Sequence, residues 1–172
     1  MKIAVLIVVA VVAALFIVAA LIPKHHTASV SRVVRGTSAD VYAIVRNAAG
    51  APQWRKDVER VEIIDATHFR EHAKYGVVTY EVIEDKPAER YATRIADQNL
   101  GYGGSWTYRF EPENGNTRVT ITEDGEVSNL FFRFMSRFVF GYKGNMEKVL
   151  AALAAFTSDK APRPNEVPSP AR

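Results

Sequence analysis

The sequence predicts an α+β protein in which a seven-stranded antiparallel sheet wraps around a long C-terminal helix, preceded by one transmembrane helix. Three observations lead to this fold class. The chain opens with an unbroken apolar run, continues with short strand-like runs between turn signals, and ends with apolar residues at helical spacing. Its 172 residues allow one domain with appendages. We expect a transmembrane anchor over residues 1–24, the folded domain over 25–157 and a disordered, proline-rich tail over 158–172.

The apolar run Ile3–Ile22 contains no charged or polar side chain. A helix of this length spans about 30 Å, the hydrocarbon thickness of a bilayer. A cleaved signal peptide would have a shorter apolar region and small residues at its cleavage site, whereas Pro23 and a histidine pair follow this run. We therefore predict an uncleaved, single-pass membrane anchor through residues 3–22. The basic residues near the two ends of the run leave its orientation open, and the very short, charged N-terminus favours an extracytoplasmic domain.

The sequence of the first part of the domain predicts one strand followed by two short helices. Side chains alternate along the chain from His26 to Gly36, as is typical of a strand. Thr37 or Ser38 can cap the helix that follows, and Thr37 lies at capping-box spacing from Asp40. Pro52 can start the second helix.

Six further strand-like runs follow, separated by turn residues. Asn114-Gly115 is the strongest hairpin signal in the chain. The short connections predict an antiparallel meander. The predicted strands are Val58–Ala66, His68–Tyr75, Val77–Glu84, Arg90–Ala96, Ser105–Glu111 and Thr117–Val127.

One long helix is predicted from Asn129 to about Phe156, because apolar side chains recur there at helical spacing. Gly141 and Gly144 weaken its middle by about 1 kcal/mol each relative to alanine, and mark a kink or a close contact. The concave face of the sheet is the natural place to bury its apolar side. We expect the basic residues of this helix on its solvated face, or against anionic lipid: Arg133, Arg137 and Lys143.

Two stretches of the chain resemble the SRPBCC superfamily, which includes START lipid-transfer domains, the birch-pollen-allergen type and polyketide cyclases and dehydrases. The stretch VVRGTSADVYAIVRNAAGAPQWRKDVERVEII resembles the opening strand, helix and Pro-x-Trp passage into the second strand. The stretch GGSWTYRFEPENGNTRVTITEDGEVSN resembles the Gly-Gly-x-Trp strand, the hairpin and the last strand before the long helix. The resemblance covers about residues 28–156. It implies a helix-grip fold with a cavity between the sheet and the C-terminal helix.

Aromatic side chains gather on one face of the predicted strand in GYGGSWTYRF, because alternate residues of a strand share a face. These rings either fill the core or line a ligand cavity, and the sequence leaves both options open. Trp54 is a further wall candidate. The complete set of candidate cavity residues is Trp54, Tyr80, Arg94, Tyr102, Trp106, Tyr108, Glu123, Phe134 and Phe138.

Polar residues within the strands offer the remaining chemistry. An inward pair of Glu123 and Arg94 could bind a polar head group or form a structural ion pair. A buried carboxylate, from Glu71, Glu81 or Glu123, could have a raised pKa and act as an acid or base. A solvated sheet face is the competing interpretation for each, so no catalytic residue is assigned.

Several classes of site are not expected. The chain has no cysteine, which removes thiolate metal sites and cysteine nucleophiles. His68 and His72 lie on a predicted strand, about 13 Å apart, too far for one metal ion. We therefore predict neither a metal nor a cofactor. The net charge of +3 is scattered along the chain, so we expect no nucleic-acid partner.

The sequence favours membrane-tethered binding of a hydrophobic small molecule or lipid in the expected cavity, without catalysis. The alternative is a polyketide cyclase/dehydrase-like enzyme that uses carboxylate, tyrosine or arginine groups of the cavity. The second alternative is a structural or partner-interaction module with a closed core. An inward carboxylate would keep the enzyme in consideration, and a large exposed apolar patch would favour the module.

Overall fold

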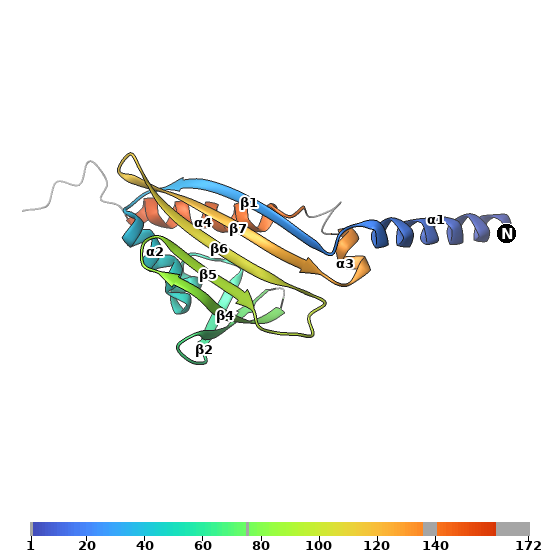
Figure 1. Cartoon of the computed structure of the whole chain (residues 1–172), viewed down its shortest axis with the longest axis horizontal. Helices are drawn as coiled ribbons and strands as arrows, with labels where there is room; N and C mark the ends of the chain where they lie inside the picture. Colours follow the sequence, from blue (N-terminus) through green and yellow to red (C-terminus); the bar gives the residue numbers. More distant parts are fainter. Residues whose placement is uncertain (1, 75, 136–140, 161–172) are drawn as a thin grey trace, which may run out of the picture.

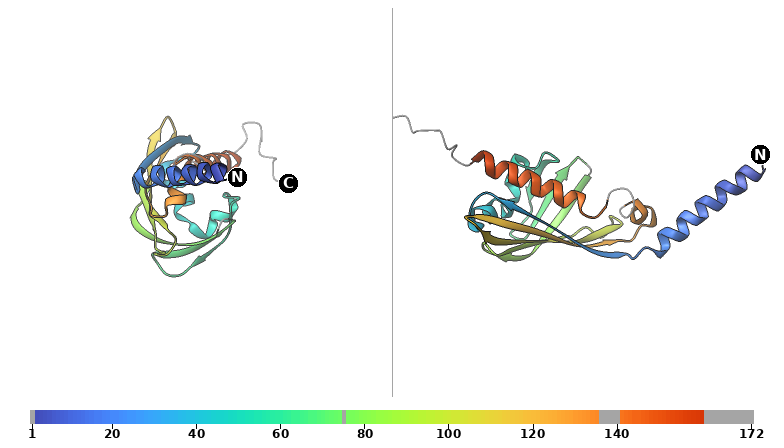
Figure 2. Two further views of the ribbon diagram at one scale, coloured as in Figure 1. Left: turned by 90° about the vertical axis from the view of Figure 1, so that its right-hand side faces the viewer. Right: turned by 90° about the horizontal axis from the view of Figure 1, so that it is seen from above.

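The computed structural model describes residues 2–74, 76–135 and 141–160 (Figure 1). Helix α1 comes first and projects away from the domain that all other elements form (Figures 1 and 2). The domain is an α+β helix-grip fold with one antiparallel sheet and a C-terminal helix, as predicted. The elements are α1 (Lys2–Leu21), β1 (His25–Val34), α2 (Ser38–Arg46), the 3-10 helix η1 (Ala48–Gln53), β2 (Val58–Ile63), β3 (His68–Ala73), β4 (Gly76–Lys86), β5 (Arg90–Ile95), β6 (Tyr102–Glu113), β7 (Asn116–Val127), α3 (Leu130–Met135) and α4 (Gly144–Lys160).

The seven strands form one antiparallel sheet in the order β1-β7-β6-β5-β4-β3-β2. Strands β2 to β7 form a meander, and β1 adds to its far side by pairing with β7. This arrangement confirms the predicted sheet. The sheet curls around one side of α4, so that it has a concave inner face (Figure 2). The strand boundaries differ from the prediction by a few residues, and β6 is longer because Tyr102–Gly104 already pair with β7.

The hairpin between β6 and β7 has the predicted turn. Asn114 and Gly115 both have positive φ angles, 49° and 77°. Two consecutive left-handed residues give a turn whose twist matches that of the strands. This turn sets the register of the longest strand pair, so Trp106 lies opposite Glu123 and Tyr108 lies opposite Ile121.

The two short helices close one end of the sheet. The hydroxyl of Thr37 accepts a hydrogen bond from the backbone N–H of Asp40, which confirms the predicted cap of α2. Pro52 does not start the second helix but lies inside η1. Asn47 begins η1 instead, because its side chain accepts from the backbone N–H of Gly50.

Helix α4 supplies the main contact between helix and sheet, and its buried residues follow helical spacing. Met146, Val149, Leu150 and Leu153 are almost fully enclosed and belong to one core with inner-face residues of β6 and β7. Burying each such side chain contributes about 1.5–3 kcal/mol. This layer fixes α4 against the β1 side of the inner face.

The single long C-terminal helix was a wrong prediction. The structure has two helices, α3 and α4, and the segment 136–140 between them lies outside the described residues. Gly141 has a φ of 68°, which a right-handed helix cannot contain. The α4 helix also continues to Lys160, beyond the predicted end at Phe156. The predicted tail from 161 onward lies outside the described residues.

Helix α1 confirms that the apolar N-terminal run is helical. Within the residues that the structure describes, no helix has the combination of length and hydropathy that a membrane span requires.

Candidate functional site

The inner face of the sheet is the candidate site, and the strand register defines it. Glu71 is buried and therefore points inward, and its neighbours at every second position of β3 share that face. Following the pairing across the sheet places one row of mostly aromatic and apolar side chains on the same face. This row includes Phe69, Glu71, Tyr80, Val82, Tyr91, Thr93, Trp106, Tyr108, Ile121 and Glu123.

The aromatic side chains of β6 become progressively more exposed to solvent along the strand. Phe110 and Tyr108 are buried in the core beside α2 and α4, with their rings stacked at 6.5 Å. Trp106 is only partly buried, 6.3 Å from Tyr108. Tyr102, at the end nearest α3, is 42% exposed. The two interpretations of this row therefore apply to different parts of it: the Phe110 end is core, and the Tyr102 end is accessible.

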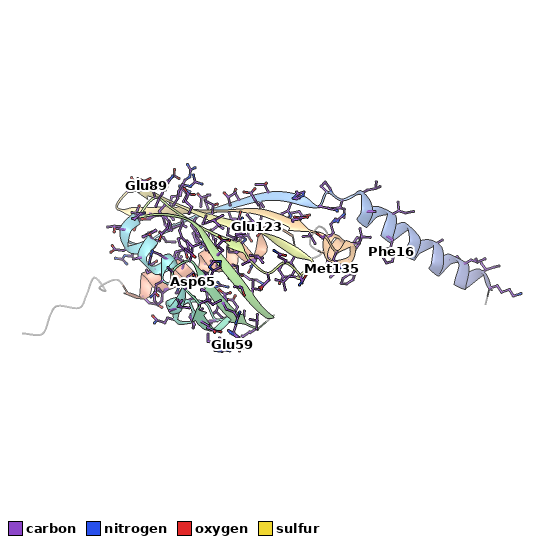
Figure 3. The ribbon with its side chains drawn as sticks, turned by 60° about the horizontal axis from the view of Figure 1, so that its bottom comes forward. Phe16, Glu59, Asp65, Glu89, Glu123 and Met135 are labelled. Carbon is purple, nitrogen blue, oxygen red and sulfur yellow. The ribbon has the colours of Figure 1, made fainter. Side chains whose placement is uncertain are left out.

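A polar cluster occupies the accessible end of the inner face. The indole Nε1 of Trp106 donates to Oε2 of Glu123 at 2.6 Å. Nε2 of His26, on β1, lies 2.8 Å from Oε1 of the same carboxylate. The His26 ring stacks on Tyr142 with 3.8 Å between centroids. Although His26 follows the apolar N-terminal run closely in sequence, its ring lies on the inner face (Figure 3 marks Glu123 in the middle of the sheet).

Two glycines make room for this cluster. A β-carbon on Gly125 would lie 2.3 Å from Cε1 of His26, so the ring occupies the space that a side chain would fill. Gly104 pairs with Gly125 across β6 and β7 and has a φ of 136°. A β-carbon there would lie 2.3 Å from the backbone oxygen of Asp124. The β6 and β7 backbones therefore leave no room for a side chain at Gly104.

A second polar centre lies on the β3 side of the inner face. The Arg55 guanidinium makes a bidentate pair with Glu71, at 2.8 Å and 2.9 Å, and also contacts Asp57 at 2.8 Å. Burial raises the pKa of Glu71, and the Arg55 charge opposes that rise. Asp57 is also partly buried, but the hydrogen bond and charge of Arg55 outweigh burial and lower its pKa.

Tyrosine hydroxyls supply neutral polar groups beside these charges. Burial raises the pKa of Tyr80 and of Tyr108 well above the usual value, and the Glu71 carboxylate adds to the rise for both. Burial likewise raises the pKa of Tyr91 to about 12. All three side chains therefore keep their protons at physiological pH and can donate hydrogen bonds.

Neither Glu71 nor Glu123 has an oxygen free of a partner. Both oxygens of Glu123 are engaged by Trp106 and His26, and both oxygens of Glu71 are engaged by Arg55. A general acid or base must reach the reacting proton within hydrogen-bond distance. These carboxylates hold protein groups in place in the described structure. Among the described residues, no group of three potential ligands is arranged to hold a metal ion.

The remaining predicted site residues lie in different places. Arg94 lies on the outer face, where it bonds Glu81 at 2.5 Å and is 55% exposed, so it forms no pair with Glu123. Trp54 is part of the core, and no partner among the described residues satisfies its buried Nε1. Phe134 lies in α3, next to β7 and α1 rather than over the middle of the sheet. Phe138 falls outside the described residues.

A hollow that the sequence did not indicate opens between α2, η1 and the inner face of β3–β5. It has a volume of about 510 Å³ and a mixed lining, with apolar side chains such as Phe69 and Val82 beside polar ones such as Asp65 and His68. Asp85, another of its polar residues, accepts hydrogen bonds from Tyr42 and from Nε of Arg46. None of the eight predicted cavity residues that the structure describes lines it. The bulge of β4 between Val82 and Glu84 turns Asp85 toward α2, and a bulge leaves no clear sequence signal.

Solved structures share this fold at low sequence identity. A START superfamily protein from Mycobacterium smegmatis has a TM-score of 0.65 and 14% identity, over 79% of this chain and 99% of that one. A protein from Thermus thermophilus has a TM-score of 0.66 and 21% identity, over 80% and 100%. The di-domain aromatase/cyclase BexL of the BE-7585A biosynthetic pathway has a TM-score of 0.66 and 17% identity, over 78% of this chain and 46% of that one. Comparison with curated proteins finds no match.

The curled sheet, the helix laid across it and the aromatic inner face define a START-like helix-grip domain. The sequence profile of one family matches residues 25–156, most of the chain. The chain belongs to this family, which is described as polyketide cyclase / dehydrase and lipid transport.

Proposed function

We propose that this protein binds a hydrophobic small molecule or lipid on the accessible part of the inner face, and does so without catalysis. The observation that carries the proposal is the gradient along β6, from buried Phe110 to exposed Tyr102. An aromatic face with few polar groups is the usual lining of a ligand site. Tyr80 and Trp106 are only partly buried and would form its walls.

The charges of the inner face favour a ligand whose polar part is neutral. Arg55 is neutralised by Glu71 and Asp57, and Glu123 is engaged by Trp106 and His26. A charged head group would have to displace one of these partners and leave a charge unpaired, which is costly. A carbonyl or hydroxyl could accept a hydrogen bond from the hydroxyl of Tyr80 without such a loss.

The cyclase/dehydrase-like enzyme is the alternative. It requires a carboxylate or tyrosine that can exchange a proton with the ligand. Two observations favour binding over catalysis: both inner carboxylates are engaged by protein donors, and burial raises the pKa of Tyr80 and Tyr108.

Membrane tethering by residues 3–22 is part of the proposal. Its support is the sequence of α1, in which apolar side chains occupy every side of the helix, with Lys2 before the run and Pro23-Lys24 after it. The short, charged N-terminus leads us to place the domain on the extracytoplasmic side. Protease added to intact cells would degrade the domain on that side and leave it untouched on the other.

Native mass spectrometry of the full-length chain, purified in mild detergent, tests ligand binding. We expect the wild type to retain an apolar molecule that organic solvent releases. Tyr80→Asp would place a charge on the inner face and abolish retention. Ile83→Asp is the matched control, because Ile83 lies on the outer face of the same strand and is exposed, so its retention should equal that of the wild type. A wild-type chain that carries no apolar molecule, and takes none up from lipid vesicles, would refute the proposal.

A further inference from the structure

The short helix α3 lies at the base of α1 and carries apolar side chains into solvent. Its sequence is Leu-Phe-Phe-Arg-Phe-Met, and Phe131 is 63% exposed. In Figure 3, Met135 lies near the base of α1, and the two helices contact each other. Six residues are too few for a stable helix on its own, so other parts of the chain must hold α3 in place.

Arg133 holds α3 in place, and it is not on a solvated face as the sequence suggested. The side chain is buried, with 4% exposed. Its guanidinium donates to three backbone carbonyls: Val127 at 3.0 Å, Ser128 at 3.0 Å and Ile22 at 3.2 Å. The first two lie at the end of β7, and Ile22 directly follows α1. Arg133 therefore joins three elements at one point.

The contact between Arg133 and Ile22 places a positive charge at the C-terminal end of α1. The last turn of α1 contains no basic residue. A helix C-terminus is favoured by a nearby positive charge, because its carbonyls carry partial negative charge. Arg133 supplies this charge from α3. The direction of α1 is thus coupled to the position of α3.

The connection between α1 and the sheet is short and held by hydrogen bonds. Only three residues separate Leu21 from His25, a reach of roughly 14 Å at most. The carbonyl of Lys24 accepts a hydrogen bond of 2.9 Å from the N–H of Val127. A domain attached in this way cannot move far from the end of α1.

We propose that α3 is a second membrane contact, seated with Phe131 at the boundary between lipid head groups and acyl chains. This inference rests on the proposed insertion of α1. Exposed Phe131 continues the exposed apolar surface of α1, and aromatic rings favour this depth of a bilayer. Lys24 and His25 are exposed just after the end of α1, where anionic head groups would meet them. The exposed apolar side chains of this surface are Ile3, Leu6, Ile7, Phe16, Ile17, Val18, Leu21 and Phe131.

The consequence concerns how a ligand reaches the inner face. The carbonyl of Gly101 accepts hydrogen bonds from Ser128 and Asn129, immediately before α3, so Tyr102 begins β6 beside this helix. With α3 on the bilayer surface, the accessible end of the inner face lies next to lipid. A hydrophobic molecule can then pass between the bilayer and the site with little exposure to water.

Depth-dependent fluorescence quenching tests this inference, and the absence of native cysteine makes single labels possible. The full chain, carrying Phe16→Cys, Phe131→Cys or Glu89→Cys with one environment-sensitive dye, is reconstituted in phosphatidylcholine/phosphatidylglycerol vesicles. Glu89 is exposed at the end of the domain opposite to α1 (Figure 3). We expect shallow lipid quenchers to reduce emission at position 131, deep quenchers to reduce it at position 16, and neither to act at position 89.

The possible outcomes distinguish failure of the proposed α3 contact from failure of the proposed tether. If label 131 is as accessible to aqueous quencher as label 89 while label 16 is quenched by lipid, α1 inserts and the α3 contact is refuted. If label 131 is quenched by lipid and label 16 is not, the α3 contact stands and the tether of the proposed function fails. If neither label is quenched by lipid, both fail. Circular dichroism of Phe131→Cys, matched to that of Glu89→Cys, verifies that the label leaves the fold intact.

Discussion

Trp106 and Glu123 lie opposite each other on β6 and β7, and the indole N–H donates a 2.6 Å hydrogen bond to the carboxylate. The same carboxylate engages His26 from β1, so three strands meet at one acidic side chain. This cluster stands where the inner face changes from closed core to accessible surface. It therefore supports the wall of the proposed ligand site.

Replacing Glu123 with methionine should lower the free energy of unfolding by about 1–3 kcal/mol, because the Trp106 N–H would lose its acceptor in a partly buried place. Asp124→Asn is the control. Asp124 is the next residue but lies on the outer face, where its carboxylate accepts a hydrogen bond from the hydroxyl of Thr27. The Asp124→Asn substitution should change the free energy of unfolding by less than about 0.5 kcal/mol. Urea unfolding of the three chains in the same detergent measures the difference. Equal midpoints for the two variants would contradict the role assigned to Glu123.

Two glutamates on neighbouring strands offer a matched comparison of inner and outer ion pairs. Glu71→Gln leaves the buried guanidinium of Arg55 without its main partner and should cost about 3 kcal/mol or more. Glu81→Gln breaks the pair with Arg94 on the outer face and should cost less than about 1 kcal/mol. Denaturant titration followed by tyrosine and tryptophan fluorescence distinguishes them. A Glu71→Gln chain as stable as Glu81→Gln would mean that Arg55 is not held by this pair.

Adjacent glycines of β6 should respond very differently to alanine. At Gly104 the new β-carbon would meet the Asp124 backbone, and the positive φ adds strain, so we expect a loss of more than about 2 kcal/mol. At Gly103 no atom lies within 4 Å of that position, and the change should be within about 0.5 kcal/mol. Thermal unfolding of both variants is the measurement. Similar melting temperatures would show that the strands are farther apart here than the structure has them.

Asp65, in the turn between β2 and β3, should make an acid-sensitive contribution to the stability of the fold. Hydrogen bonds from the backbone N–H of Thr67, and from the side chain and backbone of His68, lower the pKa of Asp65 from 3.8 to about 2. A folded-state pKa below the unfolded value stabilises the protein above pH 3.8, and this contribution is lost as the pH falls toward 2. The stability difference between the wild type and Asp65→Asn should therefore narrow over that range. Urea unfolding at a series of pH values measures it, and a constant difference would contradict the assigned pKa.

Most of the fold was predictable because it depends on local patterns. Side-chain alternation identified the strands, and Asn114-Gly115 identified the hairpin that sets the register of β6 and β7. The C-terminal helix was not predicted correctly, because apolar spacing continues across Gly141 and conceals the break. The break between α3 and α4 follows from tertiary contacts. Arg133 fixes α3 to β7 and α1, while α4 packs across the inner face.

The site was predictable in part. Alternation placed Trp106 and Tyr108 on one face but could not show which part of that face is covered. Arg94 was misplaced although alternation puts it on the face opposite Tyr91, and its pairing with β4 shows that it shares the outer face with Glu81. His26 and Arg55 could not be found, since their partners lie far along the chain or on another strand.

Photocrosslinking with a diazirine-bearing fatty acid tests the central claim most directly. The full chain would be irradiated in vesicles that contain the probe, and the modified residues would be located by peptide mass spectrometry. Our account predicts crosslinks on inner-face residues of β4 and β6, such as Tyr80, Tyr102 and Trp106, with none on outer-face Arg94 or Arg109. Crosslinks confined to α1 and α3, with the strands unmodified, would show that lipid contacts the protein but never enters the proposed site.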